Sequence, residues 1–117
     1  MISQLNPSHF AAWRDRATAA NRPVVLDVRE PWELQTASVK EDGFTLLTIP
    51  MREIPARLAE LQDTFGADHP IACLCHHGMR SLQVANYLAQ SGFSEVVNLQ
   101  GGIDAWSQQV DPGVARY

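Results

Sequence analysis

The sequence predicts an α/β fold built on a mostly parallel sheet. Four short apolar runs, at 23–28, 45–49, 71–75 and 95–99, alternate with stretches whose apolar residues recur at helical spacing. Runs that are apolar at nearly every position indicate strands covered on both faces, and strands that alternate with helices favour parallel pairing. In such sheets, ligands bind beyond the carboxyl ends of the strands.

Helices are predicted between these strands. Asn6 can cap a helix over about residues 7–19, and Pro7 suits its first turn. Further helices are expected at 31–34, from Pro55 to Phe65, at 80–91, and after the tight turn Gly101-Gly102. Trp32 and Trp106 are expected in the core, and residues 110–117 are expected to form an extended tail.

Size and composition predict one domain spanning residues 1–117, because 117 residues can bury one core but not two. A hydrophobic content of 45% and a net charge of −4 favour a globular protein over a nucleic-acid or anionic-membrane binder. The first residues lack a basic region followed by an apolar core, so we expect no signal peptide. We expect no membrane span, since no apolar run approaches ~18 residues.

The two cysteines predict free thiols. Cys73 and Cys75 lie two apart on one predicted strand, where Cβ atoms are roughly 7 Å apart and a disulfide needs ~4 Å. Free thiols favour a reducing compartment, most simply the cytoplasm. A metal site is not expected, because zinc usually takes four ligands and no second Cys/His cluster accompanies "CLCHH".

The segment "CHHGMR", residues 75–80, joins a predicted strand to a predicted helix and is called the Cys75 loop below. Backbone N–H groups at a helix start lack intrahelical partners and stabilise an anion, a thiolate included. Gly78 permits a conformation in which successive amides converge. We therefore expect Cys75 to be a reactive nucleophile, although buried structural cysteines are also common.

Three segments carry a resemblance to a known family. "VVLDVREPWEL" (24–34), "CHHGMRS" (75–81) and "VVNLQGGIDAW" (96–106) resemble the single-domain rhodaneses, a family of sulfurtransferases. The resemblance runs from about residue 20 to 110 and weakens between 37 and 47. It implies a three-layer α/β/α fold with a mostly parallel central sheet of about four or five strands.

The resemblance also implies a mechanism. Cys75 takes the outer sulfur of thiosulfate or a persulfide donor, becomes a persulfide without any cofactor, and passes that sulfur to cyanide, a thiol or an acceptor protein. Asp27 and Arg29 are implied to support the loop. A persulfide carrier without turnover is an alternative. A cysteine phosphatase or arsenate reductase is disfavoured, because the spacing here is C-x4-R and those enzymes have C-x5-R.

Several side-chain roles stay open at this point. His76 and His77 act through their rings or only through their amides, and Met79 is expected to matter for its amide. Arg80 contacts the loop or substrate, or forms a surface ion pair. Ser81 caps the helix or hydrogen-bonds the sulfur of Cys75, whereas Cys73 is expected in the core rather than as a resolving thiol.

Overall fold

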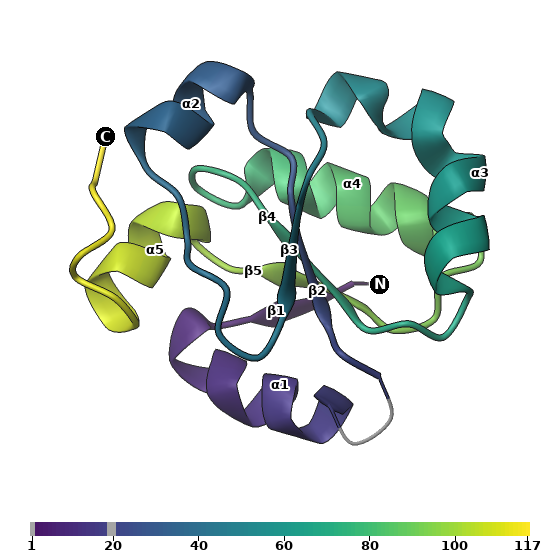
Figure 1. Cartoon of the computed structure of the whole chain (residues 1–117), viewed down its shortest axis with the longest axis horizontal. Helices are drawn as coiled ribbons and strands as arrows, with labels where there is room; N and C mark the ends of the chain where they lie inside the picture. Colours follow the sequence, from purple (N-terminus) through teal and green to yellow (C-terminus); the bar gives the residue numbers. More distant parts are fainter. Residues whose placement is uncertain (1, 19–20) are drawn as a thin grey trace.

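The computed structural model describes residues 2–18 and 21–117 (Figure 1). Within them, five strands form one sheet in the order β1-β5-β4-β2-β3, and every pair of neighbours is parallel. The strands are β1 (Ser3–Leu5), β2 (Val24–Asp27), β3 (Thr45–Thr48), β4 (Ile71–Leu74) and β5 (Val96–Leu99). The prediction of a mostly parallel α/β sheet of four or five strands is confirmed.

Helices cover both faces of this sheet, with α3 and α4 on one side and α1 and α5 on the other (Figure 1). The helices are α1 (Phe10–Thr18), α2 (Pro31–Thr36), α3 (Ile54–Phe65), α4 (Met79–Gln90) and α5 (Gly102–Gln109), with short 3-10 turns at Pro7–His9 and Met51–Glu53. The longest have 12 residues, and a bilayer needs ~20, so no described helix could cross a membrane.

Alternation along the central strands builds a core on each face. Val24 and Leu26 of β2 pack with Cys73 of β4 toward α3 and α4. Val25 points the other way and joins a cluster with Phe10 and Trp106 toward α1 and α5. Side chains on a strand alternate between faces, so a strand buried on both faces is apolar throughout. This explains why the sequence revealed these strands.

The structure differs from the sequence analysis at three places. Strand β1 was not predicted, because an edge strand of three residues with exposed Ser3 and Gln4 carries no apolar run. The first helix begins as a 3-10 turn at Pro7 and becomes α-helical at Phe10, while residue 19 of its predicted range lies outside the described residues. Trp32 is 62% exposed rather than buried, whereas Trp106 is in the core as expected.

The carboxyl ends of β2 and β4 meet at one edge of the sheet, where Asp27 pairs in register with Leu74. Helix α2 and the end of the chain lie at this same edge (Figure 1). Asp27 and Arg29 are both fully buried there, and Arg29 Nη2 donates to Asp27 Oδ2 at 2.7 Å. Burial is the largest single effect and would lower the pKa of Arg29, but hydrogen bonds and charge interactions with Asp27 and Tyr117 together outweigh it and raise the pKa.

Breaking this buried pair from one side is expected to be costly. Asp27→Ala should lower the free energy of unfolding by about 3–5 kcal/mol, because Arg29 would remain charged and buried without its partner. Urea unfolding measures this. Glu60→Ala is the control, since it breaks an exposed pair with Arg57 and should change stability little. If Asp27→Ala lowered the free energy of unfolding no more than Glu60→Ala does, the conclusion that Asp27 stabilises the buried charge of Arg29 would be contradicted.

Candidate active site

Cys75 directly follows β4, and its sulfur faces the backbone of the Cys75 loop. The backbone N–H of Gly78 donates to Cys75 Sγ at 3.1 Å. Gly78 has a φ of +100°, a left-handed conformation that glycine adopts without strain, and it caps the start of α4. The side chain of Cys75 is only 1% exposed. The sulfur therefore lies at the inner end of the loop rather than on the surface.

The following amides of the loop are available to a ligand. In the described part of the chain, the backbone N–H groups of His77, Met79 and Arg80 donate to no protein acceptor. Met79 and Arg80 open α4, where the helix dipole adds partial positive charge. Converging amides at a helix start stabilise a small anion without a charged side chain. This arrangement suits negative charge on or beside the sulfur.

The first turn of α5 supports the Cys75 loop through backbone hydrogen bonds. Ile103 and Asp104 donate their backbone N–H groups to the carbonyl oxygens of Cys75 and His76, at 2.8 and 3.2 Å. A Cβ atom on Gly102 would stand 2.4 Å from each of those oxygens, and its φ is +62°. Only glycine allows this approach. The tight turn expected at Gly101-Gly102 thus packs directly against the Cys75 loop.

Ser81 and Asn98 form a buried polar pair behind the sulfur. Ser81 Oγ lies 3.3 Å from Cys75 Sγ and 2.5 Å from Asn98 Oδ1. The single hydroxyl proton serves one of these acceptors at a time, so Ser81 can donate to Asn98 while accepting a thiol proton, or turn to donate to a sulfur anion. Asn98 Nδ2 also donates to the carbonyl of Gly78 at 3.1 Å. Ser81 therefore contacts the sulfur and does not cap α4 through its side chain.

Sequence reasoning missed Asn98. It lies within the "VVNLQGG" segment, and a polar residue inside an otherwise apolar strand was the one available signal.

The two loop histidines stack on each other. Their ring centroids are 3.9 Å apart, with His77 exposed and His76 partly buried. His76 Nε2 is buried and has no hydrogen-bond partner among the described residues. Buried polar atoms are normally paired, so this nitrogen remains free for a water or a ligand. Met79, beside it in the loop, is 71% exposed.

Arg80 forms an ion pair rather than pointing a free guanidinium at the sulfur. Its Nη1 and Nη2 donate to both carboxylate oxygens of Glu33, at 2.6 and 2.8 Å. Glu33 is 2% exposed, although it belongs to the short helix α2. The ion-pair alternative is thus the one that the structure shows, but with a buried partner. Sequence reasoning missed Glu33, because an isolated glutamate in "REPWEL" carries no spacing signal toward residue 80.

The charge of Arg80 strongly affects Glu33. Its hydrogen bonds make the largest contribution to a fall in the pKa of Glu33 from 4.5 to about 2, to which Tyr117 and the backbone of Glu30 also contribute, and which burial opposes. Asp27 and Arg29 reach the loop through this same residue, since Arg29 Nη1 donates to the backbone oxygen of Glu33 at 3.2 Å. All the predicted site residues therefore lie at one edge of the sheet.

Cys73 lies apart from this chemistry. It is fully buried in the core facing α3 and α4. Burial, with a smaller contribution from Cys75, raises the pKa of the Cys73 thiol. It therefore remains a neutral thiol that solvent does not reach, as expected for a core residue.

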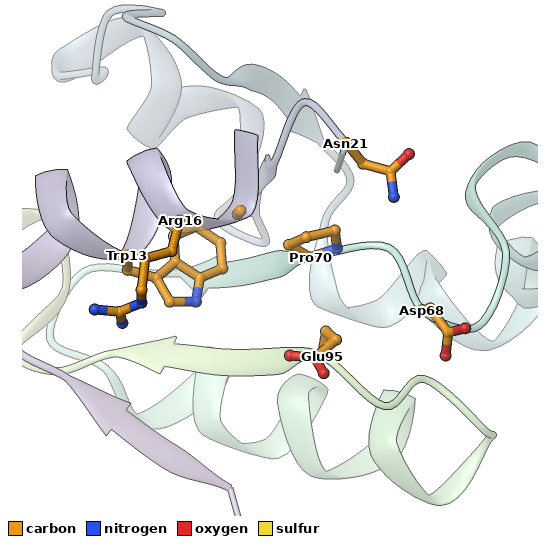
Figure 2. Close-up of a pocket in the computed structure, with 7 residues that line it drawn as sticks. Trp13, Arg16, Asn21, Asp68, Pro70 and Glu95 are labelled. Carbon is orange, nitrogen blue, oxygen red and sulfur yellow. The ribbon is translucent and has the colours of Figure 1, made fainter. Parts of the chain in front are cut away.

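Other candidate sites are less informative. No group of three or more His, Cys, Asp or Glu side chains in the described ranges could hold a metal ion. A cavity of about 380 Å³ lies at the opposite edge of the sheet, beside Pro70 and Glu95 at the starts of β4 and β5 and against Trp13 and Arg16 of α1 (Figure 2). It does not adjoin Cys75.

The Glu33–Arg80 pair predicts a pH dependence of stability. Because the pKa of Glu33 is depressed in the fold, its contribution is present above about pH 4.5 and is lost as the pH falls toward 2. The difference in unfolding free energy between wild type and Glu33→Gln should therefore shrink by roughly 1–2 kcal/mol from pH 6 to pH 3. Chemical unfolding at both pH values measures it. A difference that does not change with pH would refute the pairing; Glu60→Gln is the exposed control.

Comparisons with known proteins identify a family whose model covers most of the chain. The model of the rhodanese-like domain family matches residues 10–109. Thiosulfate sulfurtransferase GlpE of Actinobacillus succinogenes is 39% identical over 94 residues, which cover 80% of this chain and 78% of that protein. A crystal structure of a rhodanese-related protein from Thermoplasma volcanium is 29% identical with a TM-score of 0.70, covering 98% of this chain and 99% of that one.

Some relatives are much longer. Rhodanese-like/PpiC domain-containing protein 12, chloroplastic, of Arabidopsis thaliana is 38% identical over 93 residues, which are 80% of this chain but only 30% of that protein. The similarity in that case covers one part of a larger molecule. With a family match that spans most of its length and a fold shared with solved relatives, the chain belongs to the rhodanese-like domain family.

Proposed function

We propose that this protein is a sulfurtransferase that moves a sulfane sulfur from thiosulfate or a persulfide donor to a thiophilic acceptor through a persulfide on Cys75. The observation that carries the proposal is the geometry of the Cys75 loop. One amide, that of Gly78, already donates to the sulfur, and neighbouring amides in the described chain have no protein acceptor. Membership of the rhodanese-like family and relatives named as sulfurtransferases support the same reaction.

The first displacement loads the enzyme. Cys75 loses its thiol proton to solvent, and the thiolate attacks the outer sulfur of thiosulfate. A new bond forms between Sγ and that sulfur, the bond from it to the sulfonate sulfur breaks, and sulfite leaves with the electron pair. The free amides of His77, Met79 and Arg80 are placed to stabilise the charge on the outer sulfur. Preorganised donors of this kind contribute ~10²-fold or more each to rate.

The second displacement returns the enzyme to its starting state. The acceptor, cyanide in an assay or a thiolate in a cell, attacks the outer sulfur. The bond between that sulfur and Sγ breaks, and the Cys75 thiolate leaves with its electron pair. The product is thiocyanate or a new persulfide. Two successive displacements on one residue give ping-pong kinetics.

The loop favours sulfur transfer over phosphoryl transfer for three reasons. The spacing Cys75-x4-Arg80 makes a smaller ring of amides than the C-x5-R ring of the cysteine phosphatases. In addition, Arg80 directs the bidentate face formed by Nη1 and Nη2 at Glu33, so that face is not directed at a phosphate beside Cys75. Since Cys75 is only 1% exposed, a single terminal sulfur reaches it more readily than a tetrahedral group.

The proposal extends to the surroundings of the reaction. Both cysteines are free and buried, which supports a reducing compartment such as the cytoplasm. The donor is a small anion, the acceptor is cyanide, a thiol or a cysteine of an acceptor protein, and no cofactor takes part beyond the covalent persulfide.

Mass spectrometry after thiosulfate treatment tests the proposal. Wild type is expected to gain the mass of one sulfur atom and to lose it again on addition of cyanide. Cys75→Ser should gain nothing, because the thiol that would carry the sulfur is gone. Cys73→Ser is the matched control and should still gain one sulfur, since Cys73 is fully buried. Absence of the gain in wild type, or an equal gain in Cys75→Ser, would overturn the proposal.

A further inference from the structure

The segment that follows α5 is fixed to the body of the protein over residues 110–117. Ser107 Oγ donates to the carbonyl of Val114 at 2.6 Å, and Val114 is only 5% exposed within the core cluster of Phe10 and Trp106. Arg116 Nε donates to Asp104 Oδ1 at 2.9 Å. The expected tail thus packs back on α5, and it brings Tyr117 to the edge of the sheet that holds α2 (Figure 1).

The ring of Tyr117 lies flat against the first residue of the loop after the nucleophile. Its centroid is 3.8 Å from that of His76, with 7° between the planes. His77 also stacks on His76 at 3.9 Å, and two rings at such distances must occupy opposite faces of the imidazole. The ring of His76 is therefore held between Tyr117 and His77.

The hydroxyl of Tyr117 joins the charged groups behind the loop. It donates to Glu33 Oε2 at 2.7 Å and accepts from Arg29 Nη1 at 3.0 Å. Glu33 is also the partner of Arg80, so the hydroxyl of Tyr117 is connected through Glu33 to the end of the loop where Arg80 lies. Burial raises the pKa of Tyr117 to about 12, so the hydroxyl keeps the proton that it donates to Glu33.

We infer that Tyr117 is a positioning residue for the reaction at Cys75. It fixes the His76 side of the loop by stacking and the Arg80 side through Glu33, without touching the reacting sulfur itself. The inference rests on the proposed function for its consequence in sulfur transfer. Tyr117 lies after residue 109, where the match to the family model ends, so the family match does not by itself imply this role for Tyr117.

The inference predicts how the loop behaves when these contacts are removed. In Tyr117→Ala, His76 loses one stacking partner and Glu33 loses one hydrogen bond, so residues 76–80 should leave the productive arrangement more often. The rate of thiosulfate loading of Cys75 should fall ~10–100-fold, because small displacements of reacting groups have effects of that size. Tyr117→Phe keeps the ring stacked on His76 and should recover most of the loading rate.

A second readout reports the loop without requiring sulfur transfer. Methyl and benzyl methanethiosulfonate modify thiols by the same reaction but differ in size, so the ratio of their rates on Cys75 measures access to the sulfur rather than its ionisation. In wild type, where Cys75 is 1% exposed, the benzyl reagent should react far more slowly. In Tyr117→Ala its relative rate should rise about tenfold, as local opening would produce.

The experiment compares wild type, residues 1–117, with Tyr117→Ala, Tyr117→Leu, Tyr117→Phe and Arg57→Ala. Thermal unfolding first establishes which variants are folded, and the leucine variant, which keeps apolar volume but cannot stack, replaces the alanine variant if that one is not. Arg57→Ala removes an exposed ion pair with Glu60 on α3 and should match wild type in both readouts. Peptide mapping confirms that Cys75 is the modified residue.

The inference would be overturned if a folded Tyr117→Ala or Tyr117→Leu variant kept both its thiosulfate loading rate and its ratio of reagent rates within about twofold of wild type. The loop would then not open locally when Tyr117 is removed. If wild type itself takes up no sulfur, the proposed function fails, while the reagent ratio still decides whether Tyr117 holds the loop.

Discussion

The Cys75 loop lies directly on the first turn of α5, and no side chain fits between them. Carbonyl oxygens of Cys75 and His76 accept hydrogen bonds from that turn, at a place where a Cβ on Gly102 would be 2.4 Å away. In a planar trans peptide the N–H points opposite to the C=O. Fixing the carbonyl of His76 toward α5 therefore turns the N–H of His77 to the other side. The orientation of the loop amides depends on this contact.

The loop is also held by side chains that come from three other parts of the chain. Asn98 of β5 holds the carbonyl of Gly78, Glu33 of α2 holds Arg80, and Tyr117 holds His76. Each contact is made by a buried or half-buried side chain, so the loop is ordered before any substrate arrives. Donors that are already in place need no reorganisation during reaction, which is the main source of electrostatic catalysis. Asn98, Glu33 and Tyr117 thus all serve to hold one short loop in place.

Prediction from sequence succeeded where physics acts locally. Strands buried on both faces are apolar throughout, and a cysteine at a strand end before a helix start is recognisable from neighbours alone. It failed where partners are distant along the chain: Glu33 meets Arg80 across 47 residues, and Tyr117 meets Glu33 across 84. Trp32 was misplaced because hydrophobicity alone does not reveal which side of the six-residue α2 faces outward.

The central claim is that the amides of the Cys75 loop hold a negatively charged sulfur. A crystal structure of thiosulfate-treated protein tests it most directly. The account predicts one additional sulfur atom bonded to Cys75 Sγ, within hydrogen-bonding distance of the backbone nitrogens of His77, Met79 and Arg80. An additional sulfur directed away from those nitrogens, or bound only by side chains, would contradict it.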